Sequence, residues 1–396
     1  MKVSMSSPDI SDHEIKAVNR VLKTRWLSLG PILTEFESAF STYLGIDHAT
    51  AVNSGTSGLH LCMIAADIGV GDEVITPSFS FIASANCILY ERGTPVFVDI
   101  DPLTGNMDPT CIEASISPRT KAIIVVHAFG QPADMDAINA IARNHGLLVI
   151  EDACEAVGAE YKGRRAGTMS DAAVFAFYPN KQMTTGEGGM IVTDHQHWCD
   201  LFRSLRNQGR DTFNAWLDHC RLGYNYRLDE MSCALGLAQL DRIDELLAKR
   251  AQVASWYNER IESIEGIHAP WIAPSTTRMS WFVYVIRCEE EISRDQLMSY
   301  LDAHHIPSRP YFTPIHMQPF YQDRFGFRPG ALPFTEQAGR TFLALPFSSV
   351  MEEAEVDYVC WCLKNGVEAC RTYHRQFVIP NGTPFALRKL ISLLDR

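Results

Sequence analysis

Three short stretches of the sequence carry side chains that could do chemistry, and each follows an apolar run typical of a strand. In VNSGTSGLH, residues 54–57 precede an apolar helix, so backbone N–H groups and hydroxyls could converge on an anion. In VIEDACEAVGA, Asp152 ends the run GLLVI and could pair with a cationic ring nitrogen. In FAFYPNKQMTTGEGG, Lys181 precedes a turn rich in Thr and Gly, and a partly desolvated lysine can form a Schiff base.

Each stretch also has a plainer interpretation. The Ser/Thr stretch could be an ordinary N-cap, Asp152 could cap the next segment with support from Glu155, and Lys181 could be a solvated surface lysine. Their co-occurrence favours chemistry, because a phosphate cradle, an acidic strand end and a lysine are the three contacts that pyridoxal 5′-phosphate requires. Phe79 or Phe81, after the run DEVITP, could stack on a flat ring or pack in the core, and Phe81 is the better candidate because it stands closer to the helix start.

The elements that must position these residues alternate along the chain. Seven strand candidates occur between residue 49 and about residue 195, namely ATAVN, DEVITP, TPVFVDI, KAIIVVHAF, GLLVIEDA, DAAVFAF and GGMIVTD. Amphipathic helix candidates such as DMDAINAIARNHG separate several of them, which predicts an α/β fold with a large, mostly parallel seven-stranded sheet. Ligands bind beyond the carboxyl ends of such strands, where all three stretches are expected.

A long helical stretch from about residue 230 to 261 is expected to connect this sheet to a smaller α+β domain. We predict a large cofactor-binding domain over residues 1–245 and a small C-terminal domain over residues 246–370. Residues 371–396 are expected to form a C-terminal appendage.

Composition narrows the class of protein. The 396 residues are 46% hydrophobic and 21% charged, which allows a large core and disfavours disorder. A net charge of −12 argues against non-specific nucleic-acid binding, and no apolar run approaches the roughly 20 residues of a membrane span. The eleven cysteines are scattered and fit no common zinc spacing, so we expect free thiols, no metal site and a cytoplasmic protein.

Taken together, the motifs resemble those of the DegT/DnrJ/EryC1/StrS family of sugar aminotransferases, from about Ser7 to Gly366. The resemblance is carried by WLSLGP, NSGTSGL, TPSFSFIASAN, GQPADMDAI, EDACEAVGA, FYPNKQMTTGEGG and GYNYRLDEMSCALGLAQL. It implies the aspartate-aminotransferase fold, fold type I, in a homodimer with active sites at the interface.

The resemblance also implies a role for each matching residue. Lys181 matches the Schiff-base lysine and general base, Asp152 the partner of the pyridine nitrogen, and Phe81 the aromatic residue that covers the ring. The remaining cofactor contacts that the resemblance implies are Gly55 and Thr56 in the phosphate-binding turn, Glu155 near the 3′-oxygen, and Asn225, which reaches the phosphate from the partner subunit.

Two positions depart from the family pattern. Many members have serine where Ala176 stands, so the phosphate contact of that serine is lost or replaced here. Many also have glutamine where Glu155 stands, and an ionised glutamate can only accept hydrogen bonds. Some relatives that act as dehydratases carry histidine in place of the lysine, so Lys181 favours transamination.

The implied reaction moves an amino group, with glutamate as the expected donor, to a nucleotide-linked keto sugar. The stretch GYNYRL is more similar to members that aminate C4 than to those that aminate C3. The substrate-binding candidates are Arg210, Arg227, Arg309, Tyr311 and His316, and surface solvation is the alternative for Arg210 and Arg309. A keto-inositol or 3-keto sugar aminotransferase, and a non-catalytic regulatory protein on the same fold, stay open as alternatives.

Overall fold

The computed structural model describes residues 2–211 and 218–377. Its largest sheet has seven strands in the order β1-β9-β8-β5-β4-β2-β3 within these described ranges. Strand β9 runs antiparallel to both its neighbours, β1 and β8, whereas the other neighbours pair in parallel. The strands are β1 (His48–Val52), β2 (Glu73–Pro77), β3 (Thr94–Val98), β4 (Thr120–Val126), β5 (Leu148–Asp152), β8 (Ala172–Ala176) and β9 (Gly189–Thr193). The predicted α/β class and the seven-stranded sheet are confirmed.

Both faces of the sheet are covered, which is why its strands read as almost continuous apolar runs. Neighbouring residues of β4 separate to opposite faces: Ile124 packs in the core formed with α3, α4 and α6, and Ile123 packs in the core formed with α5. At the β1–β9 side, Phe36 and Phe40 of α2 pack against Phe175. The helices of this part are α1 (Asp12–Thr24), α2 (Pro31–Leu44), α3 (Gly55–Ala65), α4 (Ala83–Tyr90), α5 (Met135–His145) and α6 (Gln196–Arg206).

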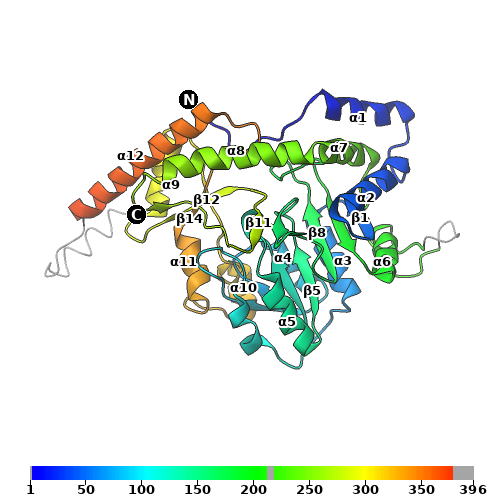
Figure 1. The fold of residues 1–396 in the computed structure, drawn as a ribbon. Coiled ribbons are helices and arrows are strands. Elements are labelled where there is room, and N and C mark those ends of the chain that lie inside the picture. The colour runs from blue at the N-terminus through cyan, green and yellow to red at the C-terminus, as the bar shows by residue number, and fades with distance from the viewer. Residues whose placement is uncertain (1, 212–217, 378–396) are drawn as a thin grey trace.

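The helical stretch expected near residues 230–261 consists of two helices, α7 (Glu230–Asp241) and α8 (Ile243–Ile261), which meet at Arg242. In Figure 1, α8 lies above the sheet and leads from α7 toward the C-terminal part of the chain. Its buried face includes Arg250, Val253 and Tyr257. Helix α8 therefore contacts both parts of the molecule, as a connector must.

The C-terminal part is built on an antiparallel four-stranded sheet of order β10-β12-β14-β13. Its strands are β10 (Ile267–His268), β12 (Tyr284–Cys288), β13 (Arg309–Pro310) and β14 (Phe342–Leu345), and its helices are α9 (Arg294–Ala303), α10 (Pro319–Phe325), α11 (Pro333–Thr341) and α12 (Glu353–Phe377). Helix α12 packs on α8 and α9. A small sheet of β11 (Thr276–Arg278), β6 (Glu160–Tyr161) and β7 (Arg164–Arg165) lies beside the main sheet.

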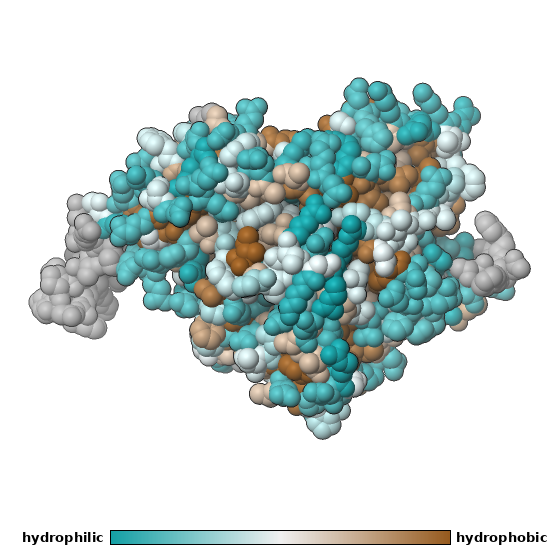
Figure 2. All heavy atoms as spheres, viewed as in Figure 1, coloured by the Kyte–Doolittle hydropathy of each residue, from teal (hydrophilic) through white to brown (hydrophobic). Residues whose placement is uncertain are grey.

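The predicted appendage over residues 371–396 begins inside α12, which continues to Phe377. Residues 378–396 lie outside the described part of the chain. Figure 2 shows a mainly hydrophilic face on which hydrophobic residues form scattered spots. Among the described helices, none has the length and apolar character needed to cross a membrane.

Candidate active site

A cavity of about 410 Å³ lies where the parallel strands of the large sheet end. This volume is within the range typical of small-molecule sites. Its lining comes from the loops after β1, β2, β5 and β8 and from the C-terminal part of the chain. The lining residues include Ser54, Gly55, Thr56, Ser80, Phe81, Asp152, Cys154, Glu155, Ala176, Tyr178, Lys181, Phe282, Tyr311 and Phe312. The structure thus brings the three stretches singled out in the sequence into one cavity.

Lys181 reaches this cavity from a turn after β8. Its backbone N–H donates to the carbonyl of Tyr178 at 2.9 Å, which closes the turn. Its Nζ lies 3.6 Å from Oε1 of Glu155 and 3.7 Å from the centroid of the Phe282 ring. With 13% of its side chain exposed, Lys181 is not the solvated surface lysine of the plainer interpretation.

Arg250 of α8 fixes the turn that carries Lys181 by hydrogen bonds to its backbone. The sequence did not predict this role. Its guanidinium donates to the carbonyls of Lys181 at 2.7 Å and of Asn180 at 3.3 Å, and also to those of Trp281 and Phe282. Arg250 is 1% exposed, and burial lowers its pKa to about 10, so it stays charged at neutral pH. An arginine inside the helical pattern of α8 gave no sequence signal, because its acceptors are backbone carbonyls far along the chain.

Asp152 is the last residue of β5, and neutral donors hold its carboxylate. The backbone N–H of Cys154 donates to Oδ1 at 3.2 Å, and the hydroxyl of Ser84 donates to Oδ2 at 2.7 Å. Both Asp152 and Ser84 are buried. The carboxylate therefore faces the cavity with its charge uncompensated by any salt bridge among the described residues.

Glu155 lies between Lys181 and the turn that follows β4. Burial raises the pKa of its carboxyl, and the nearby Lys181 opposes that shift. Its Oε2 accepts the backbone N–H of Phe129 at 2.9 Å, while Oε1 faces Nζ of Lys181. A glutamate can occupy this position because one carboxylate oxygen accepts a backbone N–H and the other faces an amine.

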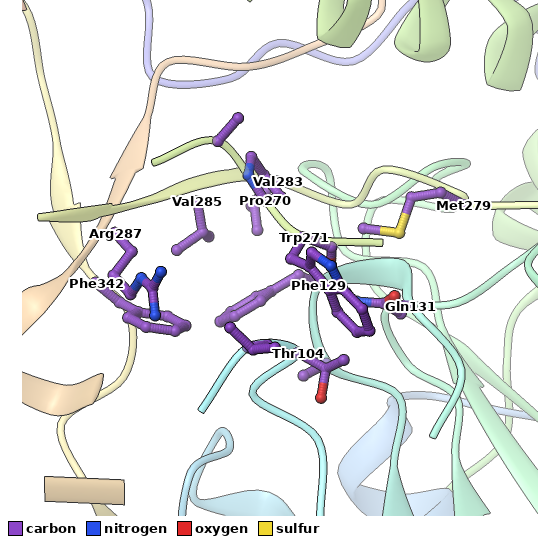
Figure 3. Close-up of a pocket in the computed structure, with 13 residues that line it drawn as sticks. Thr104, Phe129, Gln131, Pro270, Trp271, Met279, Val283, Val285, Arg287 and Phe342 are labelled. Carbon is purple, nitrogen blue, oxygen red and sulfur yellow. The ribbon is translucent and has the colours of Figure 1, made fainter. Parts of the chain in front are cut away.

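Phe129 lines a second, smaller hollow. Figure 3 shows the Phe129 ring between Phe342 and Trp271, and its other neighbour is Phe312, stacked at a centroid distance of 5.5 Å. The hollow measures about 40 Å³, which is room for little more than a water molecule. This hollow is too small for a sugar, whereas the cavity of about 410 Å³ has both the room and the chemical groups for a substrate.

The start of α3 forms a narrow cradle at the other end of the cavity. Ser54 is its N-cap, and its side chain accepts the N–H of Ser57, so the plain capping role is real. A Cβ on Gly55 would lie 2.7 Å from Sγ of Cys154 and 2.9 Å from Cβ of Ala176. Glycine therefore lets the helix start approach the strand ends closely, where its free N–H groups can bind an anion.

The two phenylalanines after β2 take different positions. Phe79 is fully buried and packs edge-on against Phe129, Phe312 and Phe342. Phe81 is 63% exposed and lines the cavity. Only an exposed ring at the cavity can cover a flat ligand, so the geometry favours Phe81 for that role.

The wall opposite the sheet is aromatic and belongs to the C-terminal part of the chain. Phe282, Tyr311 and Phe312 line the cavity from this side. Burial raises the pKa of Tyr311 to about 12, with Glu155 adding to the shift and Arg309 opposing it, so its hydroxyl is neutral and can donate a hydrogen bond. Arg309 is exposed at the start of β13, two residues before Tyr311.

Of the substrate candidates, only Tyr311 lines the cavity; Arg309, His316, Arg227 and Arg210 do not line the cavity of their own chain. His316 is fully buried, with Nδ1 at 2.7 Å from the Ser78 hydroxyl and Nε2 at 3.3 Å from Glu336. Arg227 donates to Asn207 at 3.0 Å, and Arg210 donates to Gln208 at 3.4 Å. Asn225 is exposed and does not line this cavity, although its carbonyl accepts the side-chain amide of Asn53, next to the cavity residue Ser54, at 3.4 Å.

Comparison with known proteins agrees with this geometry. The sequence profile of the DegT/DnrJ/EryC1/StrS aminotransferase family matches residues 8–364. The chain belongs to this family. It is therefore an aminotransferase, and its cofactor is pyridoxal 5′-phosphate. The residues present fit that cofactor, because the glycine cradle, the uncompensated buried carboxylate and the lysine amine lie in one cavity.

Among its relatives, the chain is 43% identical over 362 residues to GDP-perosamine synthase of Caulobacter vibrioides, which covers 90% of this chain and 96% of the relative. The solved structure of DesV from S. venezuelae, in complex with a ketimine intermediate, is 35% identical with a TM-score of 0.86 and covers 93% of this chain and 99% of DesV. The structure of DesI in the presence of its TDP-sugar product is 30% identical with a TM-score of 0.86 and covers 95% of each chain. These structures show that the sheet and the C-terminal part together form the aminotransferase fold of these enzymes.

Proposed function

We propose that the protein aminates a nucleotide-linked 4-keto sugar, with glutamate as the amino donor. One observation carries the proposal: Lys181, Asp152 and the Gly55 cradle line a single cavity in a chain similar over nearly its whole length to GDP-perosamine synthase. The C4 position rests on the stretch GYNYRL alone. The amino sugar would serve the synthesis of a surface polysaccharide, another glycan or a natural product.

Besides Lys181, four residues would hold the cofactor. The free N–H groups of Gly55 and Thr56 would bind its phosphate, with no help from Ala176. The exposed ring of Phe81 would cover its ring, and the Asp152 carboxylate would hold a proton on its ring nitrogen. When bound, pyridoxal phosphate supplies an aldehyde carbon that takes up the amino group and a ring that stabilises negative charge beside it.

Lys181 would bind the cofactor through Nζ and later act as the base. With the donor bound, Nζ would take the proton from the donor's α-carbon and pass it on within the cavity. Glu155, at 3.6 Å, would keep Nζ near this position, while the ring of Phe282 excludes water on the other side. With the keto sugar, Lys181 would move protons in the reverse order.

The sugar would lie against the aromatic wall. Phe312 offers an apolar surface, and the neutral Tyr311 hydroxyl can donate a hydrogen bond to a sugar oxygen. We propose Arg309 as the diphosphate contact, because it is exposed on the same segment as Tyr311. We do not propose His316 as a sugar contact, because its two ring nitrogens already contact Ser78 and Glu336.

We propose a homodimer with shared sites, in which Asn225 of each chain reaches the phosphate end of the other chain's cavity. Two facts support it: Asn225 is exposed without lining its own cavity, and the nearby Leu222 is 82% exposed. Arg210 and Arg227 would contact substrate only across this interface. Mixing the inactive variants Lys181→Ala and Asn225→Ala would restore part of the activity if sites are shared, and none if each chain works alone.

The proposal is tested by incubating the cofactor-loaded protein with glutamate and a panel of acceptors. The panel holds nucleotide-linked 4-keto sugars, nucleotide-linked 3-keto sugars and keto-inositols, and products are identified by mass and NMR. We expect an amine at C4 of a nucleotide-linked sugar. An amine at C3, an aminated inositol, or no product with any acceptor would overturn the proposal.

A further inference from the structure

The carboxylate of Asp152 is oriented by a side chain that lies outside its own loop. Ser84, in the first turn of α4, places its hydroxyl 2.7 Å from Oδ2 of Asp152. The two residues are 68 positions apart in the sequence: Asp152 ends β5, and Ser84 follows β2, which lies two strands away in the sheet. Ser84 is fully buried, so water cannot substitute for its hydroxyl.

The hydroxyl of Ser84 has three acceptors within reach but one proton to donate. The carbonyl of Phe81 is at 3.2 Å and the hydroxyl of Ser80 is at 2.8 Å, whereas the charged Asp152 oxygen is nearest. Charge-assisted hydrogen bonds are the strong ones, so Ser84 donates to Asp152. The Ser80–Ser84 contact is then made by the Ser80 proton, which gives a chain of two donors ending at the carboxylate.

The surroundings of Asp152 make this donor important. The thiols of Cys62, Cys87 and Cys154 lie close enough to interact with its charge, and burial raises the pKa of each, so all three are neutral at neutral pH. Glu155 also faces it, while the amine of Lys181 faces Glu155. Three polar groups contact the carboxylate among the described residues: the Cys154 N–H at 3.2 Å, the Cys154 thiol and the Ser84 hydroxyl, of which only the Ser84 hydroxyl comes from outside the loop after β5.

We infer that Ser84 is a positioning residue for the reaction: its hydroxyl, supported by Ser80, fixes Asp152 Oδ2 so that the proton stays on the cofactor's ring nitrogen. This inference rests on the proposed role of Asp152. The hydrogen bond stops the carboxylate from rotating about its last bond. Phe81 precedes Ser84 by three residues. One segment would therefore place both the aromatic ring that covers the cofactor and the hydroxyl that orients Asp152.

The test uses protein loaded with pyridoxal phosphate that carries ¹⁵N in its ring. Nitrogen NMR then reports the protonation of that nitrogen directly as pH is varied. In Ser84→Ala, the carboxylate is no longer held in one orientation, so its ion pair with the ring nitrogen weakens and the nitrogen should lose its proton about one pH unit lower than in the wild type, a tenfold change in the equilibrium. The rate of the glutamate half-reaction should fall by about the same factor.

Two matched variants keep the outcome clear. Ser84→Thr retains the hydroxyl and should titrate within a few tenths of a unit of the wild type, and Ser80→Ala, one hydrogen bond further away, should shift less than Ser84→Ala. A Ser84→Ala protein that titrates like the wild type, or a Ser84→Thr protein that shifts as far as Ser84→Ala, would overturn the inference. Asp152→Asn separates the two claims: if it leaves the nitrogen signal unchanged, the proposed role of Asp152 itself fails.

Discussion

The two walls of the cavity are built in different ways. The sheet wall consists of strand ends, and it presents the lysine, the carboxylate and the glycine cradle on short loops. The opposite wall is aromatic and consists of Phe282, Tyr311 and Phe312, which lie at least 100 positions after Lys181 in the sequence. We interpret the sheet wall as the part that holds the cofactor and does the proton chemistry, and the aromatic wall as the part that selects the sugar.

Two buried side chains fasten these walls together. Arg250 donates to carbonyls on both, at Lys181 on the sheet wall and at Phe282 on the aromatic wall. His316 ties the segment after Phe312 to Ser78 at the end of β2. The two walls can have separate roles only if the distance between them is fixed. Substitutions can test either this spacing or one wall at a time.

The largest effect is expected from Arg250→Met, which removes the charged link between the walls. Up to four carbonyls would lose a donor, which should cost about 3–4 kcal/mol of unfolding free energy. Denaturant unfolding measures this, with Arg250→Lys as the control that keeps the charge and part of the donors. A loss below about 1 kcal/mol would contradict the role given to Arg250.

Gly55→Ala alters the sheet wall alone. The new Cβ would lie under 3 Å from Cys154 and Ala176, so the start of α3 must move away from the strand ends. We expect about a 100-fold loss in cofactor affinity, since the phosphate donors shift together. Equilibrium binding of the cofactor measures it, and Gly69→Ala, whose Cβ meets nothing closer than 3.8 Å, is the matched control.

Phe312→Leu alters the aromatic wall alone. Loss of ring surface should raise the KM for the keto sugar about fivefold, corresponding to about 1 kcal/mol. The rate of the glutamate half-reaction should stay the same, because that step needs the sheet wall. Measuring the glutamate and keto-sugar half-reactions separately tests this prediction. An equal loss of activity in both half-reactions would show that the two walls do not have separate roles.

His316 gives the smallest expected effect, and one that depends on pH. Burial lowers its pKa below the ordinary value of 6.5, although Glu336 opposes the shift, so the unfolded chain takes up a proton first as pH falls. Its contribution to stability is therefore present above about pH 6.5 and is lost progressively below it. His316→Gln should flatten the fall in unfolding free energy between about pH 6.5 and 5 by under about 1 kcal/mol, as denaturant unfolding at several pH values would measure.

The sheet wall could be predicted from the sequence, and the aromatic wall largely could not. Strand ends are recognisable because each follows a buried apolar run, so Asp152 and Lys181 stand at positions that local pattern defines. Arg250 and Ser84 gave no such signal, since the contacts that matter, from Arg250 to Lys181 and from Ser84 to Asp152, span 69 and 68 residues and are set by packing. His316 was expected to contact the sugar, but a histidine between apolar residues gives no local sign that its ring points inward.

The central claim is that Lys181 moves the donor's proton inside this cavity. The most direct test adds glutamate, without any keto sugar, to cofactor-loaded protein and counts the 2-oxo acid released in a single turnover. We predict one 2-oxo acid per loaded chain in the wild type and a rate at least about 10³-fold lower in Lys181→Ala reconstituted with cofactor. Release at the wild-type rate from Lys181→Ala, or no release from the wild type, would contradict the account.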